Sequence, residues 1–136
     1  MKILYIRRKV LFFICLVIGL PLANAQSYNI DDVDGTTVSV PTASTVNFYD
    51  SGGSGGDYGD NEDYTVTFSA ENGQPLLITF TDFRTRDGND YLQIFDGANT
   101  SAPVLRTIFG NQNNTITIYP SNGEVTFRFV SDFNRT

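Results

Sequence analysis

The 136 residues are enough for one domain. Residues 26–136 contain no Cys, His or Lys, which excludes a disulfide framework, a zinc site of the usual ligands and a Ser-His or Cys-His nucleophile. The same stretch contains five Arg and fifteen Asp and Glu, which give it a formal charge of −10. This charge argues against nucleic acid or an anionic membrane as the partner and favours the binding of divalent cations.

The first 25 residues are typical of a secretory signal peptide. The segment begins with four basic residues, Lys2, Arg7, Arg8 and Lys9. An apolar run follows at Val10–Leu20, and Ala23-Asn24-Ala25 fits a cleavage site before Gln26. A retained membrane anchor is the alternative, but the apolar run is too short to span a bilayer. The sequence therefore predicts an extracellular or periplasmic protein that does not stay inserted in a membrane.

The rest of the chain reads as strands. Short alternating runs rich in Thr, Val, Ile, Phe and Tyr are separated by Gly, Asn, Asp or Pro. Residues 26–47 are expected to hold an N-terminal strand region and a linker, and residues 48–136 the main domain. Strands are predicted at 36–40, 45–49, 64–69, 76–80, 91–95, 104–108, 115–119 and 124–130, which indicates an all-β sandwich or jelly roll.

Acidic residues fall at the ends of two predicted strands. If strands 76–80 and 91–95 are antiparallel neighbours, Asp82 follows the first and Asp90 precedes the second, so both lie at one edge of the sandwich. Asp132 reaches that edge as well if strand 124–130 runs antiparallel to strand 91–95.

Three carboxylates at one edge would repel one another unless a cation neutralises them or one is protonated. Calcium suits such a set, because it takes six to eight oxygen ligands. The plainer interpretation is that these are solvated aspartates at loop ends, paired with Arg84 or Arg86 of the same loop. A further motif, Gly52–Asp57, fits the opening of a calcium-binding β-roll repeat, but it occurs once and reads more simply as a surface loop.

Several motifs, taken in order, resemble the CUB domain from about Phe48 onward. Asp57-Tyr58-Gly59 with Tyr64–Phe68 is similar to the family's Asn-Tyr-Pro stretch and its Cys-x-Trp-x-Ile strand. Asp90–Gly97 is similar to the Asp-x-Leu-x-Ile-x-Asp-Gly core, and Phe127–Phe133 to the late Phe-x-Ser-Asp strand end.

The resemblance implies a jelly-roll sandwich of two antiparallel sheets that acts as an interaction module. It also implies one calcium ion at one end of the sandwich. The matching ligand positions are Asp82, Asp90, Asp132 and Asn134, and Tyr58 matches the tyrosine that orients the acidic ligands. The partner it implies is a protein that offers a Lys or Arg side chain to these acids.

The chain also departs from the family. Both family disulfides are missing, Val66 replaces the usual Trp, and Asp82 stands where Glu is usual, one methylene shorter. The family's final strand is absent as well, so we expect a sandwich that lacks its last strand and a chain truncated at its C-terminal side.

We therefore expect a secreted, non-enzymatic, calcium-binding module for protein–protein interaction or adhesion. The alternatives are a carbohydrate-binding jelly roll, in which Tyr49, Tyr91 and Tyr119 would be candidate stacking residues, and an accessory N-terminal domain of a longer secreted enzyme. A glycoside hydrolase using Asp82 and Asp90 is the third class considered.

Overall fold

A computed structural model describes residues 25–86 and 89–133. The predicted signal peptide, apart from its last residue Ala25, lies outside that part of the chain, and so does the predicted ligand Asn134. All of the regular structure within it is β, and no helix there is long and apolar enough to cross a membrane. The strands are β1 (Gln26–Asn29), β2 (Thr37–Val40), β3 (Val46–Tyr49), β4 (Asp63–Ala70), β5 (Ile78–Phe80), β6 (Tyr91–Phe95), β7 (Val104–Phe109), β8 (Ile116–Ile118) and β9 (Glu124–Val130).

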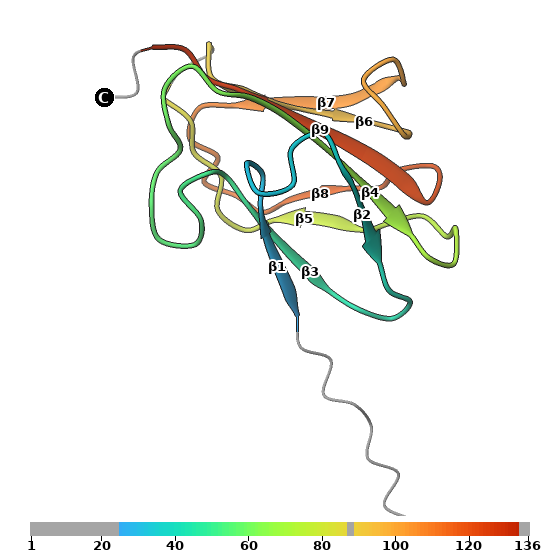
Figure 1. The fold of residues 1–136 in the computed structure, drawn as a ribbon. Helices are drawn as coiled ribbons and strands as arrows, with labels where there is room; N and C mark the ends of the chain where they lie inside the picture. Colours follow the sequence, from blue (N-terminus) through green and yellow to red (C-terminus); the bar gives the residue numbers. More distant parts are fainter. Residues whose placement is uncertain (1–24, 87–88, 134–136) are drawn as a thin grey trace, which may run out of the picture.

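One layer of the sandwich is a five-stranded sheet of order β2-β4-β9-β6-β7 (Figure 1). Its pairs are antiparallel except for β2 with β4, which are parallel. The opposite layer consists of two separate ribbons, the parallel pair β1-β3 and the antiparallel pair β5-β8. The predicted β-sandwich is thus confirmed, although two of its strand pairs are parallel.

The core lies between the layers and follows the period-2 pattern of the strands. In β4 and β9 every second residue is large and apolar and points to the core, as for Val66, Phe68, Val125, Phe127 and Phe129, all at most 5% exposed. Small and polar residues alternate with them on the outer face.

All eight predicted strands are present, with bounds shifted by two residues or fewer. The predicted pairing of β6 with β9 is confirmed. The predicted pairing of β5 with β6 is wrong, because β5 pairs with β8 in the other layer. The loop of residues 81–90 is long enough to carry the chain from one layer to the other, which the alternation of apolar residues does not reveal.

The loop after β6 folds over the outer face of the five-stranded sheet. Beneath it, Thr67 and Thr126 are 6% and 0% exposed. The Thr126 hydroxyl donates to the carbonyl of Gly97 (2.7 Å), and the Thr67 hydroxyl, 2.8 Å from that of Thr126, lies 3.2 Å from the carbonyl of Ala98. These contacts satisfy polar groups that would otherwise be buried alone.

Phe127 is at the centre of the aromatic core. Its ring packs against Phe48, Phe68 and Phe80, which come from both layers. We predict that Phe127→Ala lowers the free energy of unfolding by about 3–5 kcal/mol, because it removes buried area and leaves a cavity. Urea denaturation measures this change. The exposed Thr107→Ala is the control, with an effect within about 0.5 kcal/mol, and a cost for Phe127→Ala as small as the control's would contradict the prediction.

Candidate functional site

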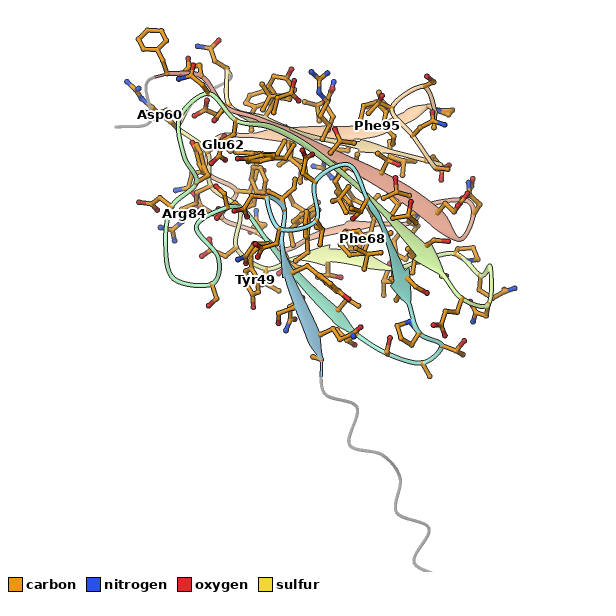
Figure 2. All side chains as sticks on the ribbon, in the orientation of Figure 1. Tyr49, Asp60, Glu62, Phe68, Arg84 and Phe95 are labelled. Carbon is orange, nitrogen blue, oxygen red and sulfur yellow. The ribbon has the colours of Figure 1, made fainter. Side chains whose placement is uncertain are left out.

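Three loops meet at one end of the sandwich. Asp63 at the start of β4 and Tyr91 at the start of β6 both lie opposite Val130 at the end of β9. The segments before β4, before β6 and after β9 therefore lie side by side. Figure 2 shows Asp60, Glu62 and Arg84 at this end.

Asp90 lies at the centre of this end and is 1% exposed. Its Oδ2 accepts a hydrogen bond from the Tyr58 hydroxyl (2.7 Å), and its Oδ1 accepts one from the backbone N–H of Asp132 (2.8 Å). A buried carboxylate is costly unless donors of this kind compensate it. The carboxylate therefore ties the loop before β4 and the segment after β9 to the start of β6.

Tyr58 is itself held on two sides. Its ring packs edge-on against Phe129 at 5.0 Å, and its hydroxyl oxygen accepts the N–H of Arg86 (2.9 Å). Thr85 extends the network, since its hydroxyl donates to the Asp90 carbonyl (2.9 Å) and accepts the N–H of Gly110 (2.7 Å). Tyr58 thus connects the Asp90 carboxylate to the loop of residues 81–86 and to the core.

The segment after β9 is fixed to the loop of residues 50–62 as well. The N–H of Asn61 donates to the Asp132 carbonyl (2.8 Å), and Ser131 and Glu62 exchange two hydrogen bonds, one from each backbone N–H. The Ser131 hydroxyl also donates to the Gly59 carbonyl (2.8 Å). Side-chain and backbone bonds here replace the sheet ladder that ends at Val130.

Glu62 is a partly buried acid at this end. Its Oε1 accepts from the Ser51 hydroxyl and from the Gly59 N–H (2.7 Å), and a side chain at Gly59 would collide with that oxygen. Its Oε2 is buried and has no hydrogen-bond partner among the residues described. The Gly-rich loop therefore bends around the carboxylate of Glu62.

Burial and neighbouring charges shift the pKa values of two acidic side chains at this end, Asp50 and Asp63. Burial raises the pKa of Asp50, and the neighbouring carboxylates of Glu62 and Asp57 add to that effect, while hydrogen bonds from the Gly52 and Gly53 N–H groups counter it. On the outer face, a hydrogen bond from Arg128 lowers the pKa of Asp63; this bidentate pair (2.8 and 2.7 Å) neutralises one acid.

The structure brings together some of the predicted ligand positions. Asp90, the backbone of Asp132 and Tyr58 form one hydrogen-bonded group, as described above. The Asp82 side chain is 74% exposed and forms an ion pair with Arg84 (3.3 Å), the pairing considered as the plainer alternative. Within residues 25–86 and 89–133, no three Asp or Glu side chains converge as a metal centre.

The candidate aromatic residues for glycan stacking do not form one row. Tyr49 belongs to β3 and Tyr91 to β6, which lie in different layers, and Tyr119 follows β8.

Sequence reasoning missed the supporting roles of Thr85 and Ser131, both buried polar residues. Ser131 lies within the Phe-x-Ser-Asp motif, but its hydroxyl contacts Glu62 and Gly59, which are 69 and 72 residues away, and only the three-dimensional arrangement reveals them. Thr85 carried no sequence signal, because an isolated Thr in a polar loop reads as a surface residue.

The hydrogen bond between Tyr58 and Asp90 leads to a prediction about the stability of the domain. Tyr58→Phe keeps the ring and removes the hydroxyl, so the buried Asp90 loses a donor, and we expect the free energy of unfolding to fall by about 1–3 kcal/mol. Thermal and urea denaturation in a chelator measure it. The matched control is Tyr119→Phe, because Tyr119 is 76% exposed; equal stabilities for the two variants would contradict the prediction.

The raised pKa of Asp50 makes a second prediction. The folded-state pKa lies above the unfolded-state value near 3.8, so protonation favours folding and this contribution is lost as the pH rises through the folded-state pKa. Asp50→Asn keeps the acceptor for the Gly52 N–H and removes the charge, so it should stabilise the metal-free protein at pH 7. The difference should shrink below pH 4, and a stability gap that does not vary with pH would refute this assignment.

Comparison with known proteins agrees with the fold. The family model for the CUB domain matches residues 39–136. Among solved structures the chain is similar to the CUB1-EGF-CUB2 domains of rat MASP-1, with a TM-score of 0.52 and 16% sequence identity. The match covers 72% of this chain and 37% of that one, so this chain spans well under half the length of that structure. Because the family model matches most of its length, the chain belongs to the CUB domain family.

Proposed function

We propose that this protein is a secreted, non-enzymatic module that binds calcium at the Asp90 end of its sandwich and there meets a protein partner, in protein–protein interaction or adhesion. CUB domains are typically protein-interaction modules and occur mostly in extracellular proteins. The observation that carries the proposal is the buried Asp90 carboxylate at the meeting point of three loops. The predicted signal peptide supports secretion.

The residues that would hold calcium are Asp90, Asp132, Asp82 and Asn134. Asp90 fits this role best, because it is an oriented carboxylate whose oxygens each have further lone pairs to offer. Asp82 fits only if its side chain leaves Arg84. Both members of that ion pair are more than 70% exposed, so breaking it costs little, about 0–1 kcal/mol.

The ion would supply positive charge among carboxylates and fix the loops relative to one another. Affinity should be modest, on the order of 10⁻⁴–10⁻³ M, as in other extracellular calcium modules. The partner would then offer a Lys or Arg side chain to the acidic ligands, in keeping with the formal charge of −10 on residues 26–136.

The same residues support a non-enzymatic role. Residues 26–136 contain no His or Cys that could act as a base or nucleophile. The two carboxylates considered for glycoside hydrolysis, Asp82 and Asp90, differ sharply in exposure: the first faces solvent and the second is buried. They therefore do not present the pair of accessible groups that flank a scissile bond.

The calcium proposal predicts a selective loss of binding. Calorimetric titration of the wild type with CaCl₂ should give binding in the range stated above, with a rise in Tm from the stabilised loops. Asp82→Asn removes a ligand charge at an exposed position and should weaken binding about tenfold or more without lowering the stability of the metal-free protein.

Asp96→Asn provides the matched control. Asp96 follows β6 at the opposite end, and its Oδ1 accepts the Ser121 N–H, a bond that Asn retains. Its calcium titration should match the wild type. If the wild type gives no heat of binding and no shift in Tm with millimolar calcium, the site is wrong.

A further inference from the structure

Strand β7 ends the five-stranded sheet on one side (Figure 1). In the part of the chain that the structure describes, residues 25–86 and 89–133, no strand pairs with its outer edge. β7 is six residues long, whereas β2, at the other edge of the same sheet, has four. Its outer edge therefore offers a row of backbone N–H and C=O groups to a further strand.

β7 has few of the features that keep an edge strand from pairing. Natural edges are usually protected by Lys, acidic residues or Pro. The sequence of β7, Val-Leu-Arg-Thr-Ile-Phe, contains none of these, and its protection is limited to Arg106 and a bulge in its pairing with β6. Val104 and Phe109, each 52% exposed, lie opposite Phe95 and Tyr91 on the face away from the core. Apolar surface thus borders both ends of the open edge.

Exposed apolar side chains continue from β7 to the neighbouring strand of the other layer. Six residues, 110–115, join β7 to β8, so the two strands remain close across the layers. Tyr119 follows β8 and is 76% exposed. Leu77 lies beside it, because Ile78 pairs with Ile118, and is 65% exposed. We call this part of the surface, formed by β7, residues 110–115 and β8, the β7 side.

The β7 side carries almost no charge. Residues 97–123, which contain β7 and β8, include no Asp or Glu and a single basic residue, Arg106, although the chain has fifteen acidic residues. Twelve of these 27 residues are Asn, Gln, Ser or Thr. An interface here therefore requires the desolvation of one charge at most from this segment, which removes the main cost of burying polar surface.

Two acids border the β7 side, and both are engaged. Asp82 forms an ion pair with Arg84, and the residue after Asp82 forms a β-bridge with Gln112. Asp96 accepts a hydrogen bond from the N–H of Ser121 (2.8 Å). The acids at the rim of the β7 side are thus compensated within the same molecule.

We propose that the β7 side is an interface with a second copy of this chain. Two β7 strands that meet edge to edge about a twofold axis run antiparallel, so each supplies the donors and acceptors that the other lacks. The pairing joins two five-stranded sheets into one continuous sheet. This inference goes beyond the function proposed above, because it needs neither calcium nor the Asp90 end.

Charge favours a second copy as the occupant. Two bodies with a formal charge of −10 repel each other, and the repulsion is smallest when their acid-free sides meet. Salt screens acids that lie more than about 8 Å apart at physiological ionic strength. A basic partner, in contrast, is drawn to the surfaces that carry the carboxylates. In the dimer, Arg106 of each copy approaches an acidic neighbour.

The edge is also ordered before a partner arrives. The hydroxyls of Thr67 and Thr126 bind the carbonyls of Ala98 and Gly97, so the β6–β7 hairpin is already held on its sheet. Pre-ordering lowers the entropic cost of association. A stable interface needs about 800 Å² from each partner, more than one strand edge supplies, so residues 110–115 and the exposed Val104 and Phe109 must contribute.

Sedimentation equilibrium of the full mature chain tests this in EDTA and about 0.5 M NaCl, which screens the repulsion between acidic bodies. The average mass should rise towards twice the monomer mass between about 1 μM and 1 mM protein. Hydrogen exchange in residues 104–109 should be about tenfold or more slower at the high concentration. A mass that is constant with concentration would overturn the proposal, and so would protection of residues 46–49 and 78–80 in place of 104–109.

Two variants of equal net charge locate the interface. Val104→Glu places an acid on the β7 side and should raise the dissociation constant of the dimer about tenfold or more. Thr37→Glu adds the same charge at an exposed position of β2, at the far edge of the sheet, and should change it by about twofold at most. Unchanged exchange in β4 and β9 checks that both fold, and Thr107→Glu takes the place of a Val104→Glu that does not. Equal effects at β7 and β2 would contradict the assignment.

Discussion

A single buried carboxylate holds one end of this sandwich together. Asp90 has almost no contact with solvent, so its charge is tolerated only because the Tyr58 hydroxyl and the Asp132 N–H donate to its two oxygens. Those donors come from segments before β4 and after β9, far from Asp90 in the sequence. The hydrogen bonds that compensate the burial of this one acid thereby fix the relative positions of loops that lie beyond the paired strands.

The other acidic residues at this end differ from Asp90 in their burial and in their partners. Glu62 is wrapped by the Gly-rich loop and keeps one oxygen buried without a partner, while Asp63 is neutralised by Arg128 on the outer face. Asp82 remains in solvent beside Arg84. Acidic residues of similar sequence context thus range from fully buried to freely solvated, and only the buried ones act on the geometry of the loops.

Much of the fold could be predicted from the sequence, because strand alternation and turn residues are local signals. The pairing of β6 with β9 was also anticipated. The pairing of β5 was not, because an apolar strand fits either layer, and the loop length permits both. β1 was not located either: its sequence, Gln-Ser-Tyr-Asn, is polar, and its pairing with β3 provides the strand character that its own residues do not.

The candidate site was only partly accessible to the same reasoning. Sequence spacing placed acids at the ends of strands, but it carried no information about the direction of their side chains. Asp82 and Asp90 flank one loop, yet one pairs with Arg84 in solvent and the other with buried donors. Thr85 belongs to the same loop, and its hydroxyl donates to the Asp90 carbonyl.

The threonine pair beneath the loop after β6 has a consequence for recognition. Thr67 and Thr126 anchor that loop through its own carbonyl groups, so the tip of the β6–β7 hairpin lies flat on the sheet and its backbone acceptors are already engaged. Such a hairpin has little freedom to reshape itself around a guest. The two threonines, from two neighbouring strands, thus fasten one end of the domain, as the hydrogen bonds to Asp90 fasten the other.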